Sequence, residues 1–367
     1  MTRPRGDREQ QPPKTVIILG AGASAADGAP TQSDLLRGFF DTYRRRLRGT
    51  SPPNRLIHQD LANYFQAMWG IDVFAGNLRK AQFPTFEESL GILEIAHSRG
   101  EFFRGLGGGD QHITGAQRLR TSLVTSIALL LKRELRTAGG HHIALLKGLH
   151  GQIRDTTFIS LNYDILVDNA IMRCTDGVPD YGVRFRGAAH GHPRSCCLLL
   201  KPHGSLNWLY CPTCNALTLT PREKAAARLH TDRHLAACGV CQGPRVPIII
   251  PPTFFKVMSN FYLQQIWKRA EDELLRADRI ILCGYSFPDA DIHIKYLLKR
   301  AEINRSGLPP AVYIVNEHVG KKGLERKAER NRYERFFRQK NQVHWTRLSF
   351  EQFAENPTLI EDPSQWL

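Results

Sequence analysis

The chain has 367 residues, of which 42% are hydrophobic and 23% charged, a composition typical of a soluble globular protein with a sizeable core. No apolar run approaches the ~20 residues that a membrane-spanning helix requires. The formal net charge of +15 favours an anionic partner, either a negatively charged cofactor or a nucleic acid.

The first residues, MTRPRGDREQQPP, are polar and lack the apolar segment of a signal peptide. We expect residues 1–13 to form a disordered tip and the protein to be cytoplasmic. In a reducing compartment its eight cysteines are thiols or metal ligands rather than disulfides.

Short apolar runs alternate with helical patterns along the rest of the chain. These runs are TVIILG (15–20), TTFIS (156–160), CCLLLK (196–201), VPIII (246–250), RIILCG (279–284), AVYIV (311–315) and QVHWTRL (342–348). They predict an α/β fold with a doubly wound, mostly parallel Rossmann-like sheet covered on both faces. Such a sheet binds its ligand outside the carboxyl ends of the strands.

Two stretches interrupt this alternation. Residues 33–150 contain helical patterns without a convincing strand, and we interpret them as a helical insertion with GLGGGD (105–110) as a flexible joint. Residues 209–245 carry two Cys-x-x-Cys pairs and form a small metal module. The Rossmann-like domain then comprises residues 14–32 and 151–367, with the metal module inserted in it.

The first strand ends in a glycine-containing turn that enters a helix, GAGAS. Glycines there let the backbone approach a phosphate, and the helix start supplies N–H donors. The candidate cofactor-binding residues are Gly20, Ala21, Gly22, Ala23 and Ser24. The alternative is a tight turn without a ligand, since the full dinucleotide pattern G-x-G-x-x-G is absent.

Two further strands deliver polar side chains to the same edge. Asn162 and Asp164 follow the run at 156–160, and His203 follows the run at 196–201. We interpret all three as candidate catalytic residues, with Asn162 and Asp164 also candidate cofactor contacts. The alternatives are that Asn162 or Asp164 only caps the next helix, and that His203 is structural.

The cysteine pairs Cys211/Cys214 and Cys238/Cys241 match a structural zinc site, because four thiolates close a tetrahedral shell and leave no position for catalytic water. His230 and His234 lie between the pairs, so three cysteines and one histidine are a minor alternative. A DNA-binding zinc ribbon is a second one.

Weaker signals lie near the C-terminus. Gly284, Tyr285 and Ser286 follow one strand and Asn316 follows the next, where a ribose or phosphate could be held. The basic segment 321–340 predicts a solvated amphipathic helix whose apolar stripe holds Leu324, Ala328 and Phe336 or Phe337. Its alternative role is a nucleic-acid surface.

The order of these motifs resembles the sirtuin (silent information regulator) family, over residues 15–24 and 156–318. The resemblance implies that the GAGAS turn holds the NAD pyrophosphate and that Asn162 and Asp164 line the nicotinamide-ribose pocket. It also implies that His203 is the family's histidine, that the zinc module follows it, and that the GYS turn and Asn316 hold the adenosine ribose and phosphates.

The chain departs from the protein-deacylating sirtuins in several places. The stretch after the first turn lacks their Phe and Arg, Leu161 stands in place of Gln, and IIIPPTFFK replaces the segment that contacts the acyl-lysine peptide. The stretches GAGASAADGAPT, NYD, HGSLNW and GYSFPDAD look instead like the divergent bacterial sirtuin-like proteins, many of which destroy NAD in antiphage defence.

The favoured hypothesis is therefore an NAD+ hydrolase that cleaves the nicotinamide–ribose bond to give ADP-ribose and nicotinamide. An NAD-dependent protein-lysine deacylase is the alternative, and a non-catalytic NAD-sensing or nucleic-acid-binding module is the second. The resemblance also implies activation through a homo-oligomer or a partner defence protein such as an ATPase.

Overall fold

The computed structural model describes residues 13–44, 52–74, 78–101, 103–104, 106, 112–135, 139–175, 177–186, 197–222, 225–229, 232–249, 260–317 and 323–367. The expected disordered tip lies outside these residues except for Pro13. His230, most of the expected joint at 105–110 and residues 250–256 of the IIIPPTFFK segment also lie outside them.

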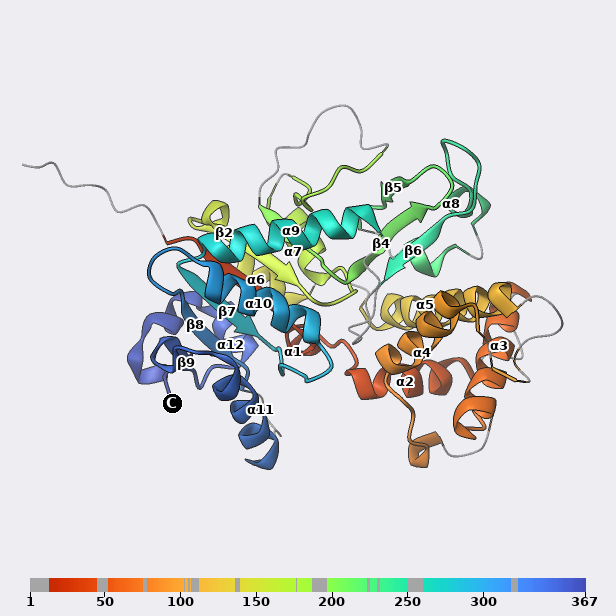
Figure 1. Cartoon of the computed structure of the whole chain (residues 1–367), viewed down its shortest axis with the longest axis horizontal. Helices are drawn as coiled ribbons and strands as arrows, with labels where there is room; N and C mark the ends of the chain where they lie inside the picture. The colour runs from red at the N-terminus through yellow and green to blue at the C-terminus, as the bar shows by residue number, and fades with distance from the viewer. Residues whose placement is uncertain are drawn as a thin grey trace, which may run out of the picture.

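A six-stranded sheet lies in the left half of the view in Figure 1, and its strand order is β3-β2-β1-β7-β8-β9. Every pairing in it is parallel. The predicted fold class is confirmed. The order reverses direction between β1 and β7, which is the point where doubly wound sheets bind ligands outside the strand ends. The strands are β1 Thr15–Leu19, β2 Thr156–Ser160, β3 Leu198–Leu200, β7 Arg279–Cys283, β8 Ala311–Val315 and β9 Val343–Trp345.

Helices cover both faces of this sheet because its strands are apolar on both sides. On one face α6, α7 and α12 pack against one another, and on the other α9 packs against α10 (Figure 1). The short α1 leads out of β1, and α11 lies beside α10. The bounds are α1 Ala21–Ala26, α6 Gly140–Gly148, α7 Leu166–Cys174, α9 Phe261–Arg276, α10 Ile292–Asn304, α11 Gly323–Phe336 and α12 Phe350–Glu355.

A second hydrophobic core lies among helices from the segment expected to be a helical insertion. The helices are α2 Gln32–Arg44, α3 Pro52–Trp69, α4 Phe86–Arg99 and α5 His112–Glu134. The described residues between 33 and 150 contain no strand. Helix α6 belongs to the first core instead, since Leu145 and Leu146 pack with the large sheet. Tyr163 and Leu166, next to the candidate site, extend into the second core.

A separate three-stranded antiparallel sheet has the order β5-β4-β6. Its strands are β4 Gly204–Cys211, β5 Ala216–Leu219 and β6 Val246–Ile249, and the short α8 Arg233–Ala236 lies between β5 and β6. Of the run at 246–250, expected in the parallel sheet, Val246–Ile249 belong here instead, because a short apolar run does not reveal its pairing partner. Trp208 of β4 is buried in the core of the large sheet and joins the two sheets.

Within the basic segment 321–340, residues Gly323–Phe336 form a helix, α11, but with a different buried face. Leu324 is 84% exposed and Ala328 is exposed as well, so the expected apolar stripe was wrong at these positions. Glu329, Tyr333 and Phe337 are buried instead. Tyr333 stacks on Phe287, with ring centroids 4.5 Å apart, so aromatic packing near the C-terminal half orients the helix.

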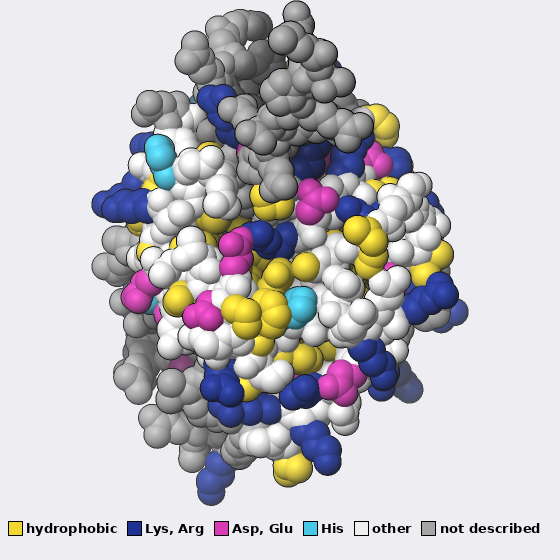
Figure 2. All heavy atoms as spheres, turned by 90° about the vertical axis from the view of Figure 1, so that its left-hand side faces the viewer, with side chains coloured by type: hydrophobic (Ala, Val, Ile, Leu, Met, Phe, Trp, Pro, Cys, Tyr) yellow, Lys and Arg dark blue, Asp and Glu magenta, His cyan; other side chains and the backbone are white. Residues whose placement is uncertain are grey.

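Charged side chains of both signs are intermixed on the visible face of the molecule (Figure 2). On the face in Figure 2, the coloured Lys and Arg side chains are scattered, with acidic side chains between them. On α11 itself, Arg330 pairs with Glu334 at 2.8 Å, and Arg335 pairs with Asp289 at 2.5 Å. None of the helices in the described ranges is both long and apolar enough to cross a membrane.

Candidate functional site

The turn after β1 and the turn after β7 are held together by their backbones. The Gly20 N–H donates to the Cys283 carbonyl at 2.9 Å, and the Gly22 N–H donates to the Gly284 carbonyl at 2.8 Å. A Cβ on Gly284 would lie 2.1 Å from the Ala23 nitrogen, and one on Gly20 would lie 2.6 Å from the Gly284 oxygen. Gly284 also has φ +60°, which favours glycine. These glycines therefore meet a packing requirement whether or not a phosphate binds.

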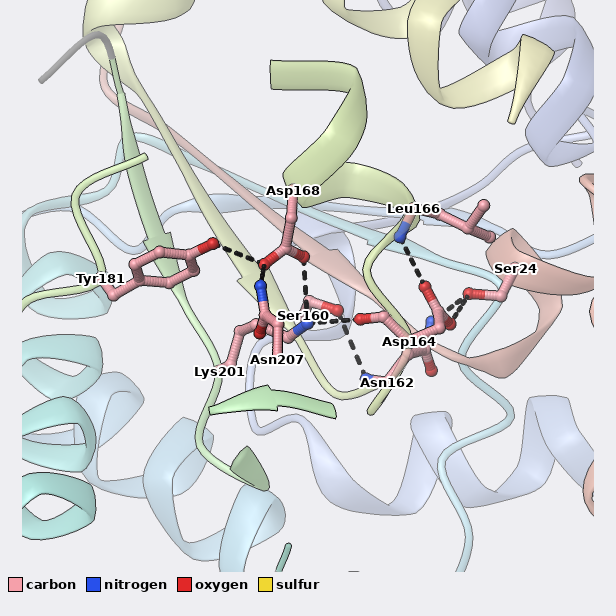
Figure 3. A network of polar contacts seen from close by, with 9 residues as sticks. All are labelled: Ser24, Ser160, Asn162, Asp164, Leu166, Asp168, Tyr181, Lys201 and Asn207. Atoms are coloured by element: carbon pink, nitrogen blue, oxygen red, sulfur yellow. Dashed lines mark hydrogen bonds and ion pairs between the residues drawn. The ribbon is translucent and has the colours of Figure 1, made fainter. Parts of the chain in front are cut away.

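Ser24, Asn162 and Asp164 form one hydrogen-bonded group at the carboxyl ends of β1 and β2 (Figure 3). The Asn162 amide nitrogen donates to the Gly20 carbonyl and to Ser24 Oγ, each at 2.8 Å. Ser24 Oγ in turn donates to Asp164 Oδ2 at 2.6 Å. The structure thus brings together residues that are 138 and 140 positions apart in the chain.

Asp164 also binds the start of α7. Its Oδ1 accepts the Leu166 N–H at 2.9 Å, so both carboxylate oxygens already have a donor. The helix-start contact that was considered as the alternative for Asp164 is therefore present alongside the contact with Ser24. Asp164 is 7% exposed, whereas Asn162 is half-buried. Of the two, Asn162 is the side chain better placed to meet a ligand.

The buried Lys201 side chain holds the loop that carries Asn162 and Asp164. Lys201 Nζ lies 3.0 Å from Asp168 Oδ2 and donates to the Asp164 carbonyl oxygen. Tyr181 OH donates to the second oxygen of Asp168 at 2.6 Å. Figure 3 shows these side chains converging on Asp168 from different segments. Neither Lys201 nor Asp168 is a candidate from the sequence, because a single charged residue does not reveal its partner.

His203 lies between aromatic rings and a carboxylate, 2% exposed. Its ring is 6.4 Å from that of Tyr163 and 6.3 Å from that of Trp267. His203 Nε2 is 3.9 Å from Asp291 Oδ1. Because Tyr163 is between Asn162 and Asp164 in the chain, the histidine adjoins the same loop. Gly204, the first residue of β4, has φ +85°, so His203 directly precedes a left-handed start of that strand.

The ends of β7 and β8 are braced by α11. Asn316 Nδ2 donates to the Tyr285 carbonyl at 3.2 Å and also to Glu329. The Tyr333 hydroxyl donates to the same carbonyl at 2.5 Å, and Arg332 donates to the Ser286 carbonyl at 2.9 Å. A cavity of about 280 Å³ opens beside Asn316. Its lining includes Asn316, Glu317, Arg326, Glu329, Arg330 and Trp345.

The four predicted zinc ligands lie together at one end of the small sheet. Their sulfur atoms are all within 4.8 Å of one another, and the Cys211–Cys241 and Cys214–Cys238 pairs are 3.5 and 3.6 Å apart. A tetrahedral site with zinc–sulfur bonds of ~2.3 Å has sulfurs about 3.8 Å apart. Backbone N–H groups of Cys241 and Val240 lower the pKa of Cys238 to about 6, whereas burial and the neighbouring thiols raise the pKa of Cys214 to about 12. The cluster is a potential structural zinc site.

Comparison with known proteins shows similarity to Sir2 structures. Sir2Tm bound to a propionylated peptide is 14% identical over 95% of this chain and 92% of that chain, with a TM-score of 0.42. A Sir2–p53 peptide–NAD+ complex is 13% identical over 95% and 92%, also at 0.42. A Sir2 homologue–NAD complex is 15% identical over 89% and 92%, at 0.43. No family model and no curated protein matches the sequence.

Proposed function

We propose that this protein is an NAD+ glycohydrolase that cleaves the nicotinamide–ribose bond to ADP-ribose and nicotinamide. The observation that carries the proposal is the convergence of three distant segments. The 20–24 turn and the Asn162–Asp164 loop are hydrogen-bonded to each other beside the reversal of strand order between β1 and β7, and His203 adjoins that loop through Tyr163. Such a reversal is where a doubly wound sheet binds a dinucleotide.

The proposed chemistry needs a held ribose, a positioned water and a proton acceptor. The bond between nicotinamide nitrogen and ribose carbon breaks, and its electron pair leaves with nicotinamide. A water oxygen bonds to the ribose carbon, and His203 accepts the proton that the water releases. The cavity beside Asn316 would take the adenosine end.

Asn162 is assigned the task of orienting that water or the ribose hydroxyls. Both hydrogens of its amide nitrogen are used inside the protein, and the Gly20 carbonyl can only accept, which leaves the Asn162 oxygen to accept from a ligand. Asp164 is proposed to contact the nicotinamide amide while holding the loop through Ser24. Zinc in the cysteine cluster would supply fold stability only.

The deciding experiment measures nicotinamide release from NAD+ with and without an acetylated peptide. We expect release that is independent of the peptide. Strict dependence on the peptide would identify a deacylase instead, with the acyl oxygen as the acceptor. His203→Ala provides the control for contaminating activity.

A third outcome separates the non-catalytic alternative. Absence of NAD+ turnover together with DNA binding that weakens steeply with salt would identify a nucleic-acid-binding module.

For an NAD+ hydrolase of antiphage defence, activity must be restrained until infection, and we propose that an oligomer or a partner ATPase supplies the trigger. The turnover assay should therefore include the protein at several concentrations.

A further inference from the structure

Asp291 places a buried carboxylate next to the proposed proton acceptor. Its Oδ1 is 3.9 Å from His203 Nε2, and each side chain is 3% exposed. The other oxygen, Oδ2, accepts a hydrogen bond from the Tyr285 hydroxyl at 2.8 Å. The distance to His203 is too long for a direct hydrogen bond, but charges interact strongly at this separation when solvent is excluded.

The Asp291 side chain does not make the hydrogen bonds expected from its position in the chain. It occupies the N-cap of α10, where an aspartate normally accepts the helix's first N–H groups. Here its side chain makes no capping hydrogen bond, and the carboxylate is directed toward Tyr285 and His203. A residue that gives up its local role for a tertiary one is expected at functional sites.

Among the contacts between described residues, Asp291 is the acidic side chain nearest to His203. Burial raises the pKa of Tyr285 well above its ordinary value, and the charge of Asp291 and the hydrogen bond to it raise it further. Burial likewise raises the pKa of Tyr163, followed by the charges of Glu87 and Asp291. Both phenols are therefore neutral. Among the residues that the structure describes, those that contact His203 include Tyr163 after β2, Trp267 of α9 and Asp291 at the start of α10. Around these, the charge of Glu87 of α4 acts on Tyr163, His293 of α10 contacts Trp267, and Tyr285 after β7 contacts Asp291.

We propose that Asp291 is a positioning residue that orients the His203 ring and stabilises its protonated form. The catalytic part of this inference rests on the proposed function, in which His203 is the proton acceptor. A carboxylate beside Nε2 favours a proton on that nitrogen, so the other ring nitrogen accepts the proton from water. The water O–H bond breaks, its electron pair stays on oxygen, and the new N–H bond completes an imidazolium facing Asp291.

The first test measures the ionisation of His203 without any substrate. Histidine labelled with ¹³C at Cε1 is followed by NMR against pH in the wild type and in Asp291→Asn, and His203→Gln identifies the signal. We expect the titration midpoint of His203 to move to lower pH by about one to two units in Asp291→Asn, since an adjacent opposite charge favours the charged form. An unchanged midpoint overturns the proposal.

The matched control is Asp289→Asn, two residues earlier in the same loop. Asp289 is 64% exposed and pairs with Lys295 and Arg335 on the surface. We expect this variant to leave the His203 midpoint unchanged. An equal shift in both variants would trace the effect to general charge and would also overturn the proposal. Asp291→Glu keeps the charge, and we expect it to restore most of the wild-type midpoint.

The second test follows the pH dependence of kcat/KM for nicotinamide release. The neutral imidazole is the active base, so activity rises with pH as His203 loses its proton. In Asp291→Asn this rise should move to lower pH by the same amount as the NMR midpoint, with a plateau lowered at least tenfold. If the wild type releases no nicotinamide, the proposed function fails, while the NMR result still decides the role of Asp291.

Discussion

Lys201 and Asp168 form an ion pair in the interior of the protein, with Nζ 3.0 Å from Oδ2 and both side chains 0% exposed. Their contact joins the end of β3 to the first turn of α7, across 33 positions of sequence. Because Lys201 also donates to the carbonyl of Asp164, the pair fixes the loop that carries Asn162. Burying two charges is costly, so the pair needs the additional hydrogen bonds from Tyr181 and Asn207.

Removing one member of this pair should destabilise the protein strongly. Lys201→Met leaves the Asp168 carboxylate buried without its cation, a change that costs about 3–5 kcal/mol. Urea unfolding monitored by circular dichroism measures it. Lys268→Met is the control, because Lys268 forms an exposed pair with Asp272 on α9 and should leave the unfolding midpoint nearly unchanged. Equal stability of the two variants would contradict the importance of the buried pair.

Loss of His203 should slow turnover strongly and leave the fold intact. General bases contribute about 10²–10⁴-fold to the rate, so we expect His203→Ala to lower kcat for nicotinamide release by that factor while the circular dichroism spectrum is retained. Asn162→Ala should also lower kcat, since it removes both the ligand contact and the hydrogen bonds to Gly20 and Ser24. Wild-type activity in both variants would remove these assignments.

The cysteine cluster should bind about one zinc ion per chain. Cys238→Ser should lower the zinc content measured by atomic emission and lower the melting temperature, because structural zinc contributes folding free energy. Cys174→Ser is the control, since Cys174 is a free thiol outside the cluster and should retain the metal. Full zinc content in Cys238→Ser would exclude this residue as a ligand.

The strands of the large sheet were predictable because each lies in a short run rich in β-branched, aromatic or other apolar residues between turn residues. The zinc cluster was predictable because Cys-x-x-Cys spacing places two ligands on one knuckle. Strand β4 was missed, since Gly204, Ser205 and Asn207 interrupt its apolar pattern, yet all three are buried. The aspartates at 168 and 291 were missed for another reason. Their partners, Lys201 and His203, are distant in sequence, and only the fold brings each pair together.

The stability of the protein should fall in acid through Asp27. This residue follows α1 and accepts the backbone N–H groups of His141 and His142 at the start of α6, at 2.9 and 3.1 Å. Its Oδ2 also lies 2.5 Å from His142 Nδ1. Burial acts to raise the pKa of Asp27, but the hydrogen bonds from His142 and His141 hold it below its ordinary value.

A carboxyl group whose pKa is lowered by folding stabilises the protein above its unfolded-state pKa of about 4 and loses that contribution as pH falls through the lower folded-state value. We therefore expect the free-energy difference of unfolding between wild type and Asp27→Asn to be largest near neutral pH and to shrink below pH ~4. Urea unfolding at pH 6, 5, 4 and 3 measures this difference. Asp362→Asn is the comparison. Asp362 is an exposed residue near the C-terminus, and hydrogen bonds from Ser364 alone lower its pKa. Solvent screens its contribution to stability. A difference that stays constant down to pH 3 would mean that the Asp27 carboxylate contributes no charge-dependent stability to the junction between α1 and α6.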